Sequence, residues 1–258
     1  MFDLPRIRTE TYVEQIVYRP EMVSTNDLAL EMCARDDILP PVLVLTDRQT
    51  AGRGRGLNRW WAGSGGLTCS LIVTAHADRL PPERRSRISL AAALAVCETV
   101  SELMPTTAVG LKWPNDVQLA GRKVSGILVE IPPLRSQKII LGIGVNVNTT
   151  FEQAPPDVRT RATSLRESGG LSYDPTDVLI RLLHRTRSEL DLLEADDDSL
   201  PLRWQALCVL RGKTVRLTVG SQTHTGLCDG IDREGALLLQ TATGPRRFFS
   251  GIITAVGN

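Results

Sequence analysis

The chain contains 258 residues, 42% of them hydrophobic, and its formal net charge is +1 at pH 7. This length and apolar content are enough for one large domain, or for a medium domain with a small appendage. The nearly balanced charge argues against binding of nucleic acid or a membrane surface through the overall field of the protein. No apolar run approaches the roughly 20 residues of a membrane span. The first ten residues also lack a basic-then-apolar signal pattern, so we expect a cytoplasmic protein.

The N-terminal part is predicted to contain a strand near Gln15–Tyr18 and a helix that follows Ser24-Thr25-Asn26. Small polar residues before an apolar periodic run are typical of a helix N-cap. The free N–H groups of such a helix start can also hold a carboxylate or a ureido-type oxygen. Capping alone and ligand binding are therefore both open interpretations here.

A stretch rich in arginine and glycine, Thr50–Trp61, lies between two predicted strands, Val42–Thr46 and Thr68–Thr74. Alternating Arg and Gly places guanidinium groups and bare backbone N–H groups along one loop, which suits an anion such as phosphate. Trp60 and Trp61 at its end can stack on a base or close over a flat ligand. Similar stretches occur in flexible nucleic-acid-binding tails, but a single internal copy between strands favours a small-ligand site.

A long, largely buried helix is predicted from Pro81-Pro82-Glu83 to Met104-Pro105. Strands and tight turns follow, and the region between Trp113 and Asn148 has an antiparallel rather than a βαβ pattern. The absence of a GxGxxG or Walker sequence argues against a Rossmann fold. The predicted segments are the strand Val109–Trp113, the short strand at Asp116-Val117, the turn Gly121-Arg122-Lys123, and the strands Ser125–Glu130 and Ile139–Asn148.

Irregular structure is predicted for Thr150–Arg161, then a second long helix over Ser172–Leu193 that is capped near Asp174-Pro175. The acidic run Glu194–Asp198 is interpreted as a solvated turn, and a short helix is expected around Trp204. Short strands separated by glycine-containing turns then predict a small β-barrel or sandwich of about fifty residues. These strands are Thr214–Val219, Thr223–Asp229, Ala236–Gln240 and Arg246–Phe249. We expect a domain boundary near Arg211, with domains at 1–210 and 211–258.

The five cysteines form no Cys-x-x-Cys pair, and the three histidines are far apart. This argues against a disulfide framework or a structural zinc site. The residues that would bind any other metal are unknown from the sequence. We interpret the cysteines as small, buried apolar residues without a reactive role.

Two further stretches carry polar chemistry: Lys112-Trp113-Pro114-Asn115-Asp116 and Gly121-Arg122-Lys123-Val124-Ser125-Gly126. A lysine on a surface turn is usually only solvated, but a lysine flanked by turn glycines can also reach an anion at close range. Its occurrence beside a glycine-rich cationic loop and an Asn-Asp turn favours the second interpretation.

Taken in order, these stretches resemble the biotin–protein ligases of the biotinyl/lipoyl-ligase superfamily, over most of Ser24–Leu165. The matching segments are Ser24-Thr25-Asn26, Gln49-Thr50-Ala51-Gly52-Arg53-Gly54-Arg55, Trp60, Lys112-Trp113-Pro114-Asn115-Asp116, Gly121–Glu130, Gly142–Asn148 and Ala162–Leu165.

The resemblance implies an α/β (α+β) catalytic domain of the class II aminoacyl-tRNA-synthetase/biotin-ligase type, a mixed sheet packed by helices, followed by an SH3-like barrel. It implies a ligase that uses ATP and Mg²⁺ to convert biotin to biotinyl-AMP, and then transfers biotin to a lysine of a biotin carboxyl carrier protein. Only 23 residues precede Ser24, so we expect no helix-turn-helix domain and no DNA-binding role. The oligomeric state is open, with a homodimer among the alternatives.

The resemblance also implies roles for individual residues. Joining a carboxylate to a polyanion requires nearby cations, for which Arg53, Arg55 and Lys123 are the candidates. Asp116 is the candidate that orients or deprotonates the acceptor amine. The implied catalytic residues are Lys123, Arg55 and Asp116; the biotin-binding residues are Ser24, Thr25, Asn26, Gln49, Arg53, Gly54, Arg55, Lys123 and Gly126; and the adenylate-binding residues are Arg53, Arg55, Trp60, Lys123 and Asn146.

The loop departs from the common pattern at Leu57, where a second glycine is frequent. Leucine does not tolerate positive φ, so a stiffer loop or another path is expected. Three alternative functions remain: a lipoate or octanoate ligase or transferase, a non-catalytic protein that binds biotin or a nucleotide, and an RNA-binding protein. The presence of Lys123 and Arg55 argues against the second, and the balanced charge against the third.

Overall fold

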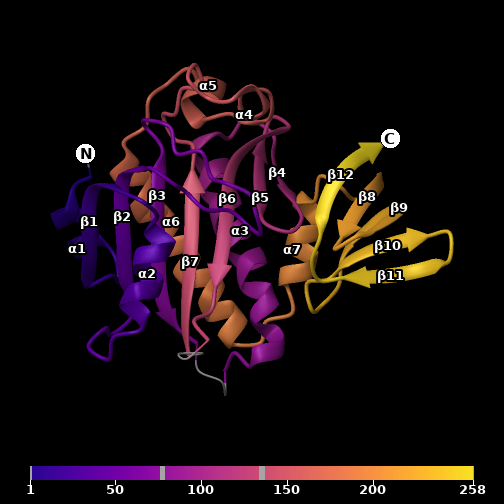
Figure 1. Cartoon of the computed structure of the whole chain (residues 1–258), viewed down its shortest axis with the longest axis horizontal. Coiled ribbons are helices and arrows are strands. Elements are labelled where there is room, and N and C mark those ends of the chain that lie inside the picture. Colours follow the sequence, from indigo (N-terminus) through magenta and orange to yellow (C-terminus); the bar gives the residue numbers. More distant parts are fainter. Residues whose placement is uncertain (1, 76–78, 134–136, 258) are drawn as a thin grey trace.

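The computed structural model describes residues 2–75, 79–133 and 137–257, and its strands form two sheets (Figure 1). The larger sheet has seven strands in the order β1-β2-β3-β7-β6-β5-β4. β1 and β2 are parallel and the other neighbours are antiparallel, so the predicted mixed sheet is confirmed. The strands are β1 Gln15–Met22, β2 Val42–Gln49, β3 Leu67–Thr74, β4 Val109–Lys112, β5 Asp116–Leu119, β6 Arg122–Glu130 and β7 Lys138–Val145.

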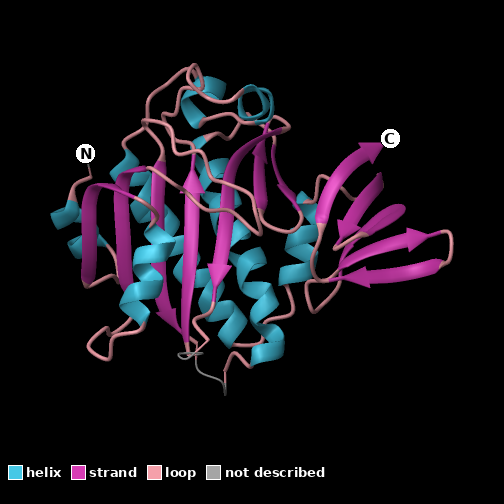
Figure 2. Ribbon diagram, in the orientation of Figure 1, coloured by secondary structure: helices cyan, strands magenta, loops and turns pink. Residues whose placement is uncertain are grey.

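Helices cover both faces of this sheet, because successive side chains of each strand point to opposite faces. Leu43 and Leu45 of β2 belong to the main core, which includes the two long helices α3 (Ile88–Leu103) and α6 (Pro175–Glu194). Val42 and Val44 pack instead with α2 (Thr25–Cys33) on the other face. Figure 2 shows these helices on either side of the strands.

The predicted N-caps of two helices are present. The Ser24 hydroxyl accepts a hydrogen bond from the Asp27 amide at 3.3 Å and begins α2. The Asp174 carboxylate accepts one from the Thr176 amide at 2.8 Å and begins α6. The remaining helices are α1 Leu4–Glu10, α4 Pro156–Arg161, α5 Leu165–Gly169 and α7 Leu200–Leu207. Among the described residues, no helix is both long and apolar enough to span a membrane.

The smaller sheet, Thr214–Gly257, is named here the C-terminal sheet. Its strands are antiparallel in the order β11-β10-β9-β8-β12. α7 lies between it and the larger sheet (Figure 1). The strands are β8 Thr214–Val219, β9 Gln222–Ile231, β10 Leu237–Thr241, β11 Gly244–Phe248 and β12 Ile252–Gly257.

Several predictions about elements were wrong. The long helix does not begin as an α-helix at its prolines, since Pro82–Arg87 forms a 3₁₀ helix and α3 begins at Ile88. The predicted turn at Gly121-Arg122-Lys123 is shorter, because β6 already begins at Arg122. Part of the predicted irregular region is α4, whose first residue Pro156 supplies the fixed φ favoured at a helix start.

One further correction concerns the C-terminal part. The acidic run Glu194–Asp198 forms a turn at the end of α6, where Asp196 pairs with Arg84 at 2.7 Å and Asp198 with Arg233 at 2.8 Å. The sequence interpretation also missed β12, which pairs with β8 along the edge of the C-terminal sheet. Two-residue alternation is weak in this strand because Ile252 and Ile253 are adjacent.

Candidate active site

On the α2 face of the larger sheet, three glycines leave a strip without side chains; this strip, named here the groove, is covered by Asn26, Trp60 and Lys123. Along β7, Ile140 packs beneath α2, and Gly142 and Gly144 follow on the same face at two-residue spacing. A β-carbon at Gly142 would overlap the Asn26 amide, and one at Gly144 would overlap the Trp60 indole. Gly126 of β6 pairs directly with Gly144. Two neighbouring strands therefore lack side chains at the place where α2 and the loop Thr50–Trp61, named here the Arg-Gly loop, approach the sheet.

A buried hydrogen-bonding cluster closes one end of this groove. The side-chain oxygen of Gln49, Oε1, accepts from the Thr25 backbone amide at 2.7 Å and from the Thr25 hydroxyl at 3.1 Å. The Ser70 hydroxyl of β3 lies 2.5 Å from Asn26 Oδ1 and 2.7 Å from Thr25 Oγ1. All four of these residues are buried. Buried polar groups that hold one another in fixed orientations can select a ligand with its own donors and acceptors.

Glu130 of β6 connects this cluster to the Arg-Gly loop. Its carboxylate accepts from Asn26 Nδ2 at 2.8 Å and from Arg53 Nη2 at 2.7 Å. Arg53 also pairs with Asp27 at 2.6 Å. Hydrogen bonds to Asp27, and then to Glu130, raise the pKa of Arg53. Arg53 therefore holds the loop to α2 and β6, and its guanidinium already faces two carboxylates.

A lysine–aspartate pair lies at the other end. Lys123 Nζ is 2.5 Å from Asp116 Oδ1, which joins β6 to the start of β5. The ammonium is 5.9 Å from the centre of the Trp60 ring. The aliphatic end of Lys123 passes over Gly126, where a β-carbon would lie 3.1 Å from both Cε and Nζ. The absence of a side chain at Gly126 gives the lysine its path over the strand.

Arg55 differs from Arg53, because its side chain has no hydrogen bond or ion pair within the described part of the chain. Burial lowers its pKa, and the charge of Asp116 partly opposes this effect. An arginine remains protonated at neutral pH even so. Arg55 is thus a half-buried cation without a bound counter-charge, next to the lysine–aspartate pair.

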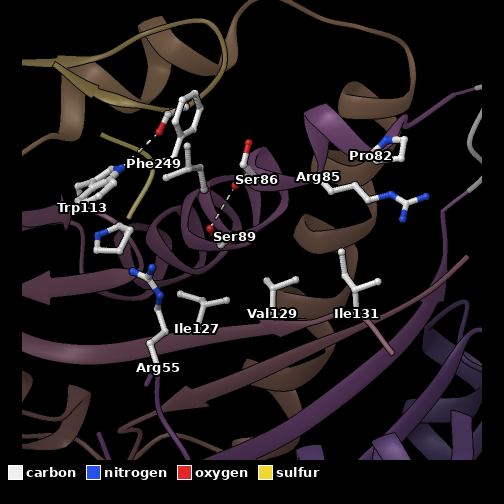
Figure 3. A pocket seen from close by; sticks show the side chains of 13 residues that line it. Arg55, Pro82, Arg85, Ser86, Ser89, Trp113, Ile127, Val129, Ile131 and Phe249 are labelled. Carbon is white, nitrogen blue, oxygen red and sulfur yellow. Dashed lines mark hydrogen bonds between the residues drawn. The ribbon is translucent and has the colours of Figure 1, made fainter. Parts of the chain in front are cut away.

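Arg55 also borders a cavity of about 360 Å³ between the larger sheet and the C-terminal sheet. Figure 3 shows its guanidinium directed toward Trp113, with Ile127 and Val129 of β6 along one wall and Phe249 across from them. Pro114, two residues before Asp116, also lines the cavity.

Asn146 lies inside the protein and holds a neighbouring backbone segment. It is buried, and its Nδ2 donates to the Thr163 carbonyl at 3.0 Å. The backbone at Thr163 in turn donates to the Lys123 carbonyl at 2.9 Å. Asn146 thus fixes the segment between α4 and α5 beside the backbone of Lys123.

The structure brings most of the predicted residues together from distant parts of the sequence: Thr25, Asn26, Gln49, Arg53, Trp60, Asp116, Lys123 and Gly126. Gly54 lies against Asn58 within the Arg-Gly loop. Ser24 differs from the other predicted residues because its hydroxyl is engaged as the N-cap of α2. The analysis of the sequence missed Ser70 and Glu130 as members of the site, and Gly142 and Gly144 as its floor. Ser70 is fully buried within β3, and Glu130 is the partly buried last residue of β6, where three apolar residues precede it. A polar side chain that is withdrawn from water needs a hydrogen-bonding partner, and this marks both positions.

The described residues contain no group of three or more His, Cys, Asp or Glu side chains that could hold a metal ion. All five cysteines are free. Four are buried, as expected, but Cys208 is only half-buried.

Comparisons with known proteins give the same architecture. Residues 20–148 match the Biotin/lipoate A/B protein ligase family, and residues 211–254 match the Biotin protein ligase C terminal domain. The bifunctional ligase/repressor BirA of Bacillus spizizenii is 32% identical over 251 residues, which are 96% of this chain and 76% of that protein. The biotin–[acetyl-CoA-carboxylase] ligase of Mycobacterium tuberculosis is 34% identical, over 84% of this chain and 79% of its own length.

A solved structure agrees with the sequence relatives. The biotin protein ligase from Aquifex aeolicus in complex with biotin and ATP superimposes with a TM-score of 0.81 and 28% identity, covering 94% of this chain and 98% of that one. A mixed sheet with a glycine-floored groove, followed by a small antiparallel sheet, thus defines a protein of the biotin protein ligase class. The chain belongs to the Biotin/lipoate A/B protein ligase family.

Proposed function

We propose that this chain is an ATP-dependent ligase that activates biotin as biotinyl-5′-AMP and transfers it to a lysine of a biotin carboxyl carrier domain. The observation that carries the proposal is the placement of the Lys123–Asp116 pair and the unpaired Arg55 at one end of a groove. The other end is a buried polar cluster. A ligand with a polar ring at one end and a carboxylate at the other fits this order of groups.

In the first step, a carboxylate oxygen of biotin attacks the α-phosphorus of ATP. An acyl–phosphate bond forms, the bond to the β-phosphate breaks, and pyrophosphate leaves. Two anions must approach each other, and each close contact with a cation contributes roughly 4 kcal/mol at an effective dielectric of about 20. Lys123 and Arg55 are placed to supply these contacts, and the Trp60 indole covers the groove between them and the glycine floor.

In the second step, the amine of the acceptor lysine attacks the acyl carbon. The bond to the adenylate oxygen breaks, AMP leaves, and the amine loses a proton. Asp116 is the carboxylate nearest to the reacting end of the groove, and we assign it the orientation or deprotonation of the amine. Its contact with Lys123 keeps one carboxylate oxygen in a defined direction.

The polar cluster favours biotin over lipoate. The ureido ring of biotin offers a carbonyl oxygen and two N–H groups, whereas the dithiolane ring of lipoate has neither. Thr25, Asn26, Gln49 and Ser70 are buried, and an apolar ring would leave their free hydrogen-bonding capacity unused at a cost of about 1–3 kcal/mol per group.

Magnesium enters this proposal with the substrate, as Mg-ATP. Mg²⁺ at nucleotide sites is usually held by phosphate oxygens and only one or two carboxylates.

The test is pyrophosphate release by the purified chain with Mg-ATP and either biotin or lipoate, with Lys123→Ala as the control. Release with biotin alone that is lost in the variant supports the proposal. Release with lipoate would assign the chain to the lipoate branch, and no release with either acid would leave a binding protein.

A further inference from the structure

One side chain of the candidate active site is hydrogen-bonded to the C-terminal sheet. The indole N–H of Trp113 donates to the Gly235 carbonyl at 3.3 Å, and the ring is only 2% exposed. Figure 3 shows this bond above Arg55, at the side of the cavity between the two sheets. Trp113 stands between β4 and the Pro114-Asn115 turn that leads to Asp116.

Gly235, which accepts this hydrogen bond, lies in a turn of the C-terminal sheet, Asp232–Ala236, and this turn is itself closely fixed. The Asp232 carboxylate accepts from the backbone amides of Glu234 and Ala236, both at 2.9 Å. Arg247 of β11 pairs with Asp232 and with Glu234, both at 2.5 Å. The shape of the turn is therefore determined within the C-terminal sheet.

The same turn is seated on the helical layer of the larger domain. The Ser86 hydroxyl donates to the Glu234 carbonyl at 3.1 Å. Gly235 has a φ of +85°, and a β-carbon there would lie 2.6 Å from Leu90 Cδ1. Only glycine fits this contact, because the backbone conformation and the space both exclude a side chain.

Beyond Trp113 the chain is held again at Asn115. Its Nδ2 donates to the Ile127 carbonyl at 2.6 Å, and the Ile127 amide donates to the Asn115 carbonyl at 3.1 Å. Asp116 follows, in register with Gly126 and in contact with Lys123. The Trp113–Asp116 segment is thus fixed at one end by the C-terminal sheet and at the other by β6.

We infer that the Asp232–Ala236 turn positions the Asp116–Lys123 pair, and that Trp113 is the positioning residue through which it acts. The inference rests on the proposed function for the roles of Asp116 and Lys123. It gives the C-terminal sheet a definite task at the reacting centre, although none of its residues needs to touch a substrate there.

The experiment compares Trp113→Phe and Gly235→Ala with Gly244→Ala as the matched control. Phenylalanine keeps an apolar ring and removes the N–H donor. Gly244 also has a positive φ, +107°, but no atom lies within 4 Å of its added β-carbon, so its alanine variant carries backbone strain away from Trp113.

Two measurements are made on the full chain. Hydrogen exchange at the Ile127 amide reports whether the turn beyond Trp113 is still held, and it needs no substrate. Single-turnover transfer to a biotin carrier domain reports the reaction, and the amplitude of the pyrophosphate burst counts competent molecules. A small displacement of reacting groups costs up to 10²-fold in rate, so we expect about a tenfold slower transfer at an unchanged burst amplitude.

We expect Trp113→Phe and Gly235→Ala to show both faster exchange at the Ile127 amide and slower transfer. We expect Gly244→Ala to match the wild type in both measurements. Wild-type exchange at Ile127 in both test variants would overturn the inference, as would wild-type transfer. A wild-type chain that releases no pyrophosphate would contradict the proposed function instead, and the exchange measurement would still decide whether the turn holds the segment.

Discussion

The indole of Trp60 occupies the space that a side chain at Gly144 would need. The same ring lies 3.5 Å from the β-carbon position of Gly126 on the neighbouring strand. Gly144 therefore provides the space that Trp60 of the Arg-Gly loop occupies. The loop reaches the floor of the groove only because Gly144 lacks a side chain.

Gly144→Ala is expected to displace Trp60 and to raise the KM for ATP about tenfold, since overpacking of this kind costs about 1–3 kcal/mol. Pyrophosphate release at varied ATP measures the effect, and tryptophan fluorescence reports the displacement of the ring. Gly66→Ala is the control, because its β-carbon would meet no atom closer than 3.3 Å. Equal KM values for the two variants would show that Trp60 does not cover the nucleotide.

Glu130→Gln is expected to raise the KM for biotin about fivefold to tenfold. The charge that holds Arg53 is lost, and Asn26 is no longer fixed by a carboxylate; hydrogen bonds to charged groups are worth about 1.5–3 kcal/mol. Glu21→Gln is the matched control, because Glu21 also pairs with an arginine, Arg48 at 2.9 Å, but on the exposed surface. A wild-type KM in Glu130→Gln would exclude a role of this carboxylate in ligand binding.

Asp116→Asn is expected to retain the pyrophosphate burst and to slow transfer to the acceptor about 10²-fold, since a positioned base typically contributes 10²-fold or more. Rapid mixing of preformed adenylate with the carrier domain measures the transfer step separately. Asp37→Asn, which removes an exposed partner of Arg35, serves as the control. If Asp116→Asn transfers as fast as the wild type, another group must receive the proton.

Cys208 is expected to be the first cysteine alkylated by iodoacetamide. A hydrogen bond with the Cys228 thiol lowers the pKa of Cys208, whereas burial raises the pKa of Cys69 to about 12. The thiolate is the reactive form, so the alkylation rate at Cys208 should rise and level off at a lower pH than the rate at Cys69. Peptide mass spectrometry at several pH values follows each site. Equal rates at Cys208 and Cys69 would contradict the prediction.

The local signals in the sequence were sufficient for most of the larger sheet. Ser24 and Asp174 are N-caps, and caps depend on neighbouring residues only. The antiparallel order of β5, β6 and β7 follows from short connections that leave no room for a crossover helix. These features could be predicted because each is determined within a few residues of the chain.

The missed features depend on contacts between distant segments. Ser70 and Asn26 are 44 positions apart, and Arg53 and Glu130 are 77 apart. No local pattern distinguishes a strand serine that holds a ligand-binding amide from one that fills a core. The corrected start of α3 is similar, because Arg84 and Arg87 in the 3₁₀ turn face Asp196 at the end of α6.

The two ends of the Arg-Gly loop are held by different kinds of interaction, which respond differently to the salt concentration. Arg53 is fixed by ion pairs at a partly exposed position, whereas Trp61 packs with Phe151 at a ring distance of 5.7 Å, beside α4. Added salt screens exposed charges and leaves apolar packing intact or stronger. Raising the ionic strength should therefore weaken the ion pairs of Arg53 with Asp27 and Glu130 and leave the contact of Trp61 with Phe151 in place, so salt would loosen one end of the loop and not the other.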